Sequence, residues 1–291
     1  MTDVCLVNLA VADLLLAASL PFLAHQGRDQ WIFGDAMCKT VLGIYHIVFY
    51  AGIFFITLMS IDRYLAIVHA VYAMRARTRS FGAAAAGVTW LAGFLSSFPE
   101  VTFLQTVQQS DPSKASFCFP VYTNRDGTSS HFWGVFSLFK MNVLGLFVPA
   151  AIMAFCYSQI IRRLLSSQSP KRQAIHLVLV VMAVFFVCWV PYNVASFFRA
   201  LELLHIYTEC QSSKDIRLAL QITEMVAYLH SCLNPVLYVF VGEKFRRNLL
   251  RLIHRAPCGL CRLVRVVLPQ EHLSRSFISQ TTSLDERSTA V

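Results

Sequence analysis

The sequence predicts an all-α membrane protein. Hydrophobic residues make up 56% of the 291 positions and charged residues only 14%, which is far from the composition of a soluble domain. The apolar residues are gathered into six runs, each long enough to cross a hydrocarbon core of roughly 30 Å as a helix. Basic residues are concentrated in alternate connections between these runs. The predicted spans are 4–24, 37–68, 81–104, 132–161, 174–204 and 216–241, and they form one domain, 1–241.

The net charge of +9 follows this topology and does not form a nucleic-acid-binding face. The positive-inside rule places the second and fourth connections and the C-terminal tail in the cytoplasm, so nucleic acid is not an expected partner. An even number of spans then puts Met1 in the cytoplasm too, so either the protein has six spans or a first span is missing. The basic residues are Arg75, Arg77, Arg79, Arg162, Arg163, Lys171, Arg172 and a run from Lys244 to Arg265.

The first span carries Asp13 near its middle. An acidic side chain at that depth needs a partner, water or an ion, and is a functional candidate for that reason. A protonated or solvated structural acid fits the position equally well. The position alone does not decide between the two.

The second span ends in Asp62-Arg63-Tyr64. Asp and Arg cost roughly 2.5–3.5 kcal/mol each at the centre of a bilayer. Their adjacent placement at a span end suggests an ion pair that can be kept or broken. The alternative is that the two charges only mark the water interface.

Prolines mark the spans, and each is expected to remove an intrahelical hydrogen bond and bend its helix. Trp189 lies close before one of these bends, and Asn234 and Tyr238 flank another. Bent helices with bulky side chains at the bend suit a bundle that has two alternative packings. The prolines are Pro21, Pro99, Pro149, Pro191 and Pro235.

Glu224 lies in the outer half of the last span. Because a carboxylate facing lipid would be costly, it is expected to face a polar cavity open to the outside. There it could meet a cationic ligand group or a proton. A simple intramolecular pair is the alternative.

Three cysteines lie on the predicted outer side, where an oxidising environment allows a disulfide: Cys38, Cys118 and Cys210. A Cys38–Cys118 bond is the preferred pairing, because it would pin the loop 105–131 across the mouth of the bundle. Cys210 is then left over, which is consistent with a missing N-terminal partner.

The chain changes character after Val241. Residues 242–256 predict an amphipathic helix on the inner membrane surface, attracted to anionic lipid. Cys258 and Cys261 follow it and are either palmitoylated or free thiols. Residues 257–291 are rich in Ser and Thr and predict a disordered, phosphorylatable cytoplasmic tail.

No catalytic set is present, so the protein is not expected to be an enzyme or to carry a cofactor. The sequence lacks a Gly-x-Ser-x-Gly elbow, a His-Glu-x-x-His pair and a phosphate-cradling glycine loop. Its histidines lack metal-ligand spacing, so no metal is expected either. A transporter is the more serious alternative, but no inverted repeat is visible.

Together these residues resemble the rhodopsin-like G-protein-coupled receptors, and more closely the CC chemokine receptors. The resemblance implies a seven-transmembrane receptor bundle of which this chain spans the second to seventh helices and the surface helix, without the first helix and N-terminus. The residues that carry it are Asn8 to Asp13, Ser19 to Phe22, Trp31 to Gly34, Cys38, Asp62 to Ala70, Trp90, Pro149 with Tyr157, Cys188 to Asn193, Asn234-Pro235 with Tyr238, and Gly242 to Arg246.

The resemblance implies a ligand pocket lined by Tyr45, Phe49, Tyr192 and Glu224, with Glu224 attracting the basic or amine end of a chemokine. Leu23 departs from the tryptophan common in the family, so a minor subpocket is expected to differ. A sodium site at Asp13 is weakened, because Gly52 replaces a hydroxyl residue and His230 an asparagine.

The resemblance also implies a plasma-membrane, multi-pass receptor with a cytoplasmic C-terminus. Arg63 would be held by Asp62 at rest and released toward an inhibitory-class heterotrimeric G protein, driving chemotaxis and calcium signalling. Receptor kinases and arrestin would act on the tail. A scavenging receptor and a transporter remain alternatives. The implied activation switch consists of Asp62, Arg63, Tyr64, Tyr157, Trp189, Pro191, Asn234, Pro235 and Tyr238.

Overall fold

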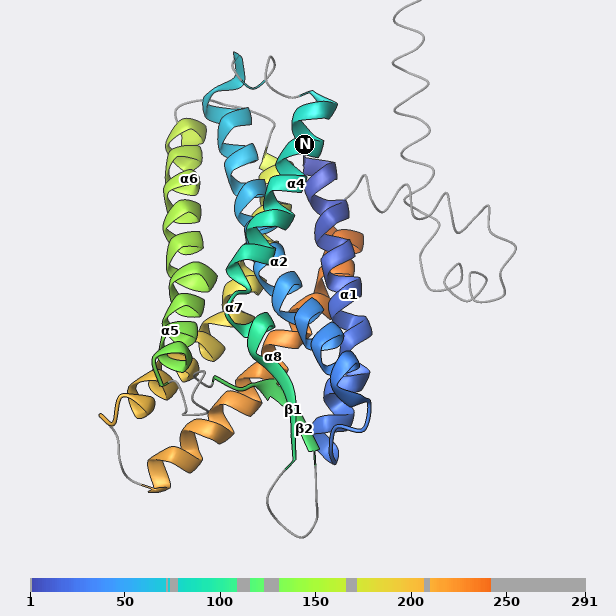
Figure 1. The fold of residues 1–291 in the computed structure, drawn as a ribbon. Coiled ribbons are helices and arrows are strands. Elements are labelled where there is room, and N and C mark those ends of the chain that lie inside the picture. The colour runs from blue at the N-terminus through green and yellow to red at the C-terminus, as the bar shows by residue number, and fades with distance from the viewer. Residues whose placement is uncertain are drawn as a thin grey trace, which may run out of the picture. The chain divides into compact units, whose positions relative to one another are not determined.

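The computed structural model describes residues 2–71, 73, 78–108, 116–122, 131–165, 172–206 and 210–241 (Figure 1). The chain divides into two compact units, Met1–Leu237 and Tyr238–Val291, and the first contains nearly all of the described residues. The predicted surface helix 242–256, the tail 257–291, and Cys258 and Cys261 lie outside the described residues.

The first unit is built mainly of long helices that run along one another (Figure 1). α5, a π-helical turn and α6 follow without a break and form the predicted span 132–161. A hairpin of two short strands, β1 and β2, lies at the end of the bundle where α1 ends and α2 begins (Figure 1). The elements are α1 Thr2–Arg28, α2 Gly34–Val68, α4 Arg79–Ser96, the 3₁₀ helix η1 Glu100–Phe103, β1 Leu104–Gln108, β2 Ser116–Pro120, α5 His131–Asn142, the π turn η2 Val143–Phe147, α6 Val148–Leu165, α7 Arg172–Leu203 and α8 Cys210–Val241.

The prediction of a helical membrane bundle is confirmed. Within the described residues, four helical stretches are long and apolar enough to cross a membrane, and Ser80–Ser96 is a shorter apolar helix. Exposed large hydrophobic side chains are numerous along these helices, as expected for surfaces that face lipid. The four stretches are Asp3–Arg28, Gly34–Val68, His131–Arg163 and Met182–Leu203.

The predicted span 81–104 is wrong at its outer end. α4 ends at Ser96, and the chain then turns through η1 into β1. Pro99 therefore lies in this turn and bends no helix, because proline disfavours helical geometry in the residue before it and cannot continue a helix. The β-hairpin was not predicted. Pro21 and Pro191 lie inside helices as expected.

Pro149 lies directly after the π turn, as the second residue of α6. A proline has no N–H to donate to the preceding turn, and the wider π turn is a common way for a helix to adjust at such a point. The turn also carries Gly145, where a Cβ atom would lie 3.3 Å from Cζ of Phe49. The absence of a side chain there lets this helix approach α2 closely.

α2 is the central helix, and it packs against α1, α4, α6 and α7. It approaches α4 closely at Gly93, where a Cβ atom would lie 3.0 Å from both the Cβ and the backbone N of Ala51. Small residues at a helix contact let backbones approach in membrane proteins. α4 is also joined to α1, since the Trp90 indole N–H donates to Oδ1 of Asn8 at 2.9 Å.

Gly93→Ala is expected to destabilise the bundle by about 1–3 kcal/mol, because the added methyl group meets backbone atoms that cannot move aside. Gly87→Ala is the matched control on the same helix, since nothing lies within 4 Å of a Cβ atom there. That variant should be neutral or slightly more stable, given the higher helix propensity of alanine. Thermal unfolding in detergent measures both, and equal melting temperatures for the two variants would refute the close contact.

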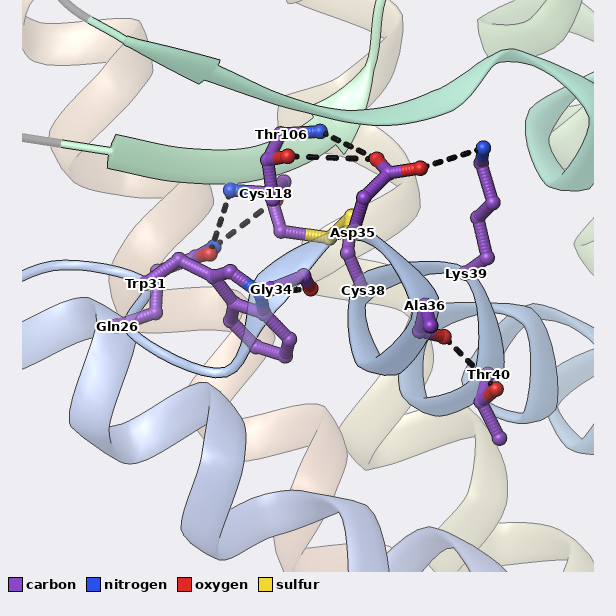
Figure 2. The surroundings of a disulfide bond; sticks show 10 residues. All are labelled: Gln26, Trp31, Gly34, Asp35, Ala36, Cys38, Lys39, Thr40, Thr106 and Cys118. Carbon is purple, nitrogen blue, oxygen red and sulfur yellow. Dashed lines mark hydrogen bonds and ion pairs between the residues drawn. A yellow bond between two sulfur atoms is a disulfide. The ribbon is translucent and has the colours of Figure 1, made fainter.

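The hairpin is held by a disulfide between Cys38, at the start of α2, and Cys118 in β2, with a Cα–Cα distance of 5.6 Å. This is the expected pairing. Figure 2 shows the polar contacts around it. The Gln26 side chain accepts from the Cys118 backbone N–H at 2.8 Å and donates to its carbonyl oxygen at 3.1 Å. Asp35 accepts from the Thr106 backbone N–H at 3.1 Å, so both strands are tied to helices.

The loop between α1 and α2 adds two further ties to β2. The Trp31 backbone N–H donates to the Ser116 carbonyl at 2.6 Å. The Ser116 N–H donates in turn to Oε1 of Gln30 at 3.3 Å. Buried Trp31 also packs with Cys38, Leu104 and Cys118 in one hydrophobic cluster. The hairpin is thereby a fixed part of this end of the bundle.

Candidate functional site

Glu224 on α8 accepts hydrogen bonds from two tyrosines, Tyr228 on the same helix and Tyr45 on α2. The Tyr228 hydroxyl donates to its Oε1 at 2.6 Å, and the Tyr45 hydroxyl approaches the same oxygen at 3.4 Å. The two phenol rings meet edge to face with centroids 5.8 Å apart. Glu224 therefore has intramolecular partners, which agrees with the alternative interpretation of this residue. Both partners are neutral hydroxyls, however, so they stabilise a carboxylate without supplying a positive charge.

An aromatic cluster continues from Tyr45 along α2. Phe49 lies one helical turn further on and packs on Trp189 of α7, with centroids 4.7 Å apart. Trp189 in turn contacts the Tyr192 ring, with centroids 6.2 Å apart. The four predicted pocket residues are thus linked in two pairs. Tyr45 contacts Glu224, and Phe49 is connected to Tyr192 through Trp189. Tyr45 and Phe49 lie one turn apart on α2, which places the two pairs side by side.

Buried polar side chains link α5 to α7 around Pro191. The Asn142 amide donates to Oγ of Ser196 at 3.3 Å, and the Ser196 hydroxyl donates to the Asn193 carbonyl at 2.9 Å. The Asn193 amide donates to the Trp189 carbonyl at 2.9 Å. These groups supply side-chain hydrogen bonds to the backbone beside a proline that cannot donate one. Trp189 is thereby fixed both through its ring and through its carbonyl.

The Asp62-Arg63-Tyr64 segment lies near the other end of α2. Asp62 is buried and Arg63 and Tyr64 are half-buried, and neither Asp62 nor Arg63 is without a partner. The Tyr64 hydroxyl lies 3.1 Å from Nε2 of His69, and its ring packs 5.7 Å from that of Phe155 on α6.

Tyr157 is buried on α6, the helix that packs beside α2. α2 therefore carries the predicted pocket residues Tyr45 and Phe49 in its first half and the predicted switch segment near its end. Asn234, Pro235 and Tyr238 belong to the helical backbone of α8, but their side chains lie outside the described residues.

Asp13 is buried on α1 and has an interaction partner. Gly52 faces α1, since a Cβ atom there would meet Cδ1 of Leu9 at 3.7 Å. His230 is buried beside Phe185, with ring centroids 5.5 Å apart. Its Nε2 has no hydrogen-bond partner in the described part of the chain. A sodium site at Asp13 stays a prediction.

Sequence reasoning missed a buried ion pair between Glu100, at the start of η1, and Lys140, in the last turn of α5. The Lys140 ammonium lies 2.6 Å from Oε2 of Glu100, with the side chains 9% and 7% exposed. Lys140 also donates to the Ser96 carbonyl at 2.6 Å and to the Phe98 carbonyl, while the Ser137 hydroxyl donates to Glu100. The available signal was a lysine inside a predicted span, because such a charge needs a partner. Tyr228 was also missed, although its spacing of four residues from Glu224 places both on one helix face.

A helical membrane bundle with a disulfide-linked hairpin at one end and an Asp-Arg-Tyr segment near the far end of α2 is typical of one class of membrane receptor. The family described as "7 transmembrane receptor (rhodopsin family)" matches residues 1–238, and the chain belongs to this family.

Within the family, the chain is similar to C-C chemokine receptors. It is 41% identical to C-C chemokine receptor type 8 of Mus musculus over 283 residues, which cover 97% of this chain and 78% of that receptor. It is 42% identical to the probable C-C chemokine receptor type 3 of Mus musculus over 290 residues, 98% of this chain and 79% of the relative. Identity to C-C chemokine receptor type 1 of Homo sapiens is 42% over 257 residues, 88% and 71% of the two chains. The protein is thus a multi-pass plasma-membrane receptor of the chemokine-receptor type, and not an enzyme.

Proposed function

We propose that this receptor binds a CC chemokine at the hairpin end of the bundle and activates an inhibitory-class heterotrimeric G protein at the other end. In a cell this would drive chemotaxis and calcium signalling. The observation that carries the proposal is the course of α2, which joins Tyr45 and Phe49 in the pocket to Asp62 and Arg63 near its far end. The C-terminus is then cytoplasmic, and receptor kinases and arrestin act on the tail.

Ligand recognition would centre on Glu224. Its two hydrogen-bond donors are tyrosine hydroxyls, so the carboxylate keeps acceptor capacity for a ligand ammonium or guanidinium group. The surrounding aromatic faces of Tyr45 and Tyr228 suit the same cationic groups. A basic or amine end of a chemokine has the complementary chemistry.

Transmission would pass through Trp189, which touches the pocket residue Phe49 and lies two residues before Pro191. A ligand that prefers one packing of this region shifts the population of the whole bundle toward that state. A G protein that prefers the same state raises the affinity for the ligand by the same factor, because the coupling is reciprocal. Release of Arg63 from Asp62 is the proposed event at the inner end.

Two substitutions test the two ends separately. Glu224→Gln removes a charge-assisted hydrogen bond, which is worth about 1.5–3 kcal/mol, so chemokine affinity should fall by about 10- to 100-fold. Arg63→Ala should leave chemokine binding in place and reduce chemokine-driven nucleotide exchange on the inhibitory-class G protein. Ligand displacement and exchange assays on the same membranes measure both.

Full exchange activity in the Arg63→Ala variant would contradict the proposed mechanism. Chemokine uptake by the unmodified receptor without any nucleotide exchange would favour a scavenging receptor instead. The effect of Glu224→Gln on affinity is expected under either function, so it tests ligand recognition independently of G-protein activation.

A further inference from the structure

Two imidazole rings meet at the hairpin end of the bundle, away from the pocket residues described above. His131 is the first residue of α5, and His205 lies just beyond the end of α7. Their ring centroids are 5.6 Å apart and the ring planes differ by only 8°. Both side chains are exposed, so their rings can turn and their nitrogens are accessible to solutes.

The backbone at His205 is in the left-handed region, with φ of 58°. The Ile206 N–H donates to the Leu201 carbonyl at 3.1 Å, and the His205 N–H donates to the Glu202 carbonyl at 2.9 Å. This is the Schellman pattern of a helix end, with His205 at the position that glycine usually occupies. Histidine tolerates this conformation better than most side chains, but it still gives up stability that glycine would retain. A side-chain role at this position would explain the choice of histidine.

We propose that His131 and His205 together bind a divalent transition-metal ion, with Zn²⁺ as the best-suited ion. Imidazole nitrogen is a preferred ligand of this class of metal. Zn–N bonds of about 2.0–2.1 Å in tetrahedral geometry need the two nitrogens to lie about 3.3 Å apart. The parallel rings are near enough to reach this separation by turning about their side-chain bonds.

The site is an open one. No group of three His, Cys, Asp or Glu side chains suited to a metal ion occurs in the described ranges, so water would fill the remaining coordination positions. Two imidazole ligands with water give reversible binding, in contrast to the closed four-ligand sites that hold structural zinc. The ion would join α5 to α7, two helices that already pack together. It would therefore stabilise the present spacing of α5 and of the end of α7, the helix that carries Trp189 and Pro191.

The test uses the full chain purified in detergent, with Cys258→Ser and Cys261→Ser in every sample because those thiols are themselves good zinc ligands. Thermal unfolding is followed as ZnCl₂ is added, with MgCl₂ as the control for a general divalent effect. The melting temperature of the parent protein should rise with the logarithm of the zinc concentration, by about 5 °C at a hundredfold excess over the dissociation constant, and should not respond to magnesium.

Three variants identify the ligands. His131→Ala should bind zinc at least tenfold more weakly. His205→Gly should weaken zinc binding by a similar factor, yet melt at a higher temperature than the parent without zinc, because glycine relieves the left-handed backbone. His25→Ala is the matched control, since Nδ1 of this outer histidine is engaged with the Gln30 carbonyl at 3.0 Å, and it should respond like the parent.

An unchanged zinc response in either His131→Ala or His205→Gly would overturn the proposal. So would an equal response to magnesium, or loss of the response in His25→Ala. His205→Gly keeps the test decisive even where an alanine variant folds poorly, because this substitution favours the folded helix end.

Discussion

Lys140→Met is expected to lower the free energy of unfolding by about 3–5 kcal/mol, because it leaves the buried Glu100 carboxyl without its cation. It also removes the donor to the Ser96 and Phe98 carbonyls at the end of α4. The double variant Glu100→Gln/Lys140→Met should recover part of the loss, since no isolated charge remains. Thermal unfolding of the purified receptor compares the stability of the parent, the single variant and the double variant.

Asp35 and Lys39 provide the matched control for this pair. Their ammonium–carboxylate distance is also 2.6 Å, but the side chains are 55% exposed for Lys39 and 46% for Asp35. Exposed pairs contribute about 0–1 kcal/mol, so Lys39→Met should change stability little. Since the two ion pairs have the same distance, the difference in stability between Lys140→Met and Lys39→Met would come from burial. Equal effects at Lys39 and Lys140 would show that the buried pair contributes no more to stability than the exposed one.

Cys38→Ala is expected to lower the free energy of unfolding by about 4.5 kcal/mol. The disulfide closes a loop with a sequence separation of 80 residues and so limits the entropy of the unfolded chain. Cys118→Ala should have the same effect. The double variant should be no worse than either single one, since all three lack the same bond. Chemokine binding should fall in parallel, as the hairpin loses its covalent tie to α2.

Cys156→Ala is the control for this series, because Cys156 is a buried free thiol on α6. Its loss removes one small buried atom and should cost only about 1 kcal/mol. Melting temperatures with and without a reducing agent give the comparison. A fully additive double variant would mean that the two cysteines act independently and not through a shared bond.

The helices could be predicted from the sequence because each apolar run is long enough to span a bilayer. Hydropathy placed the end of the third span too late, because Val101, Phe103 and Leu104 continue the apolar composition past Ser96, where the helix ends. Leu104 is only 1% exposed and packs in the cluster around the disulfide, so its hydrophobicity serves a folded hairpin and not a lipid contact. A count of apolar residues cannot separate these two environments, although Pro99 was a usable stop signal.

The cluster around Glu224 could be anticipated in part from the sequence. Glu224 was identified because a carboxylate inside a span is costly, but its direct donor Tyr228 was not, since tyrosine in a span is unremarkable by composition. Glu100 and Lys140 were missed for a different reason. Each is a single charge within an apolar window, and they lie on segments 40 residues apart that only the tertiary structure brings together.

The hydrogen bonds between β2 and the neighbouring loop and helix limit how a ligand can bind along this strand. An open strand edge offers a row of free N–H and C=O groups to which an incoming chain can add another strand. On β2 those groups are already occupied: Ser116 bonds with Trp31 and Gln30, and Cys118 bonds with Gln26 through both its N–H and its carbonyl. Pro120, the last residue of the strand, has no N–H to offer. A ligand segment that runs along β2 would therefore have to be recognised mainly through its side chains, because the backbone N–H and C=O groups of Ser116 and Cys118 are already hydrogen-bonded.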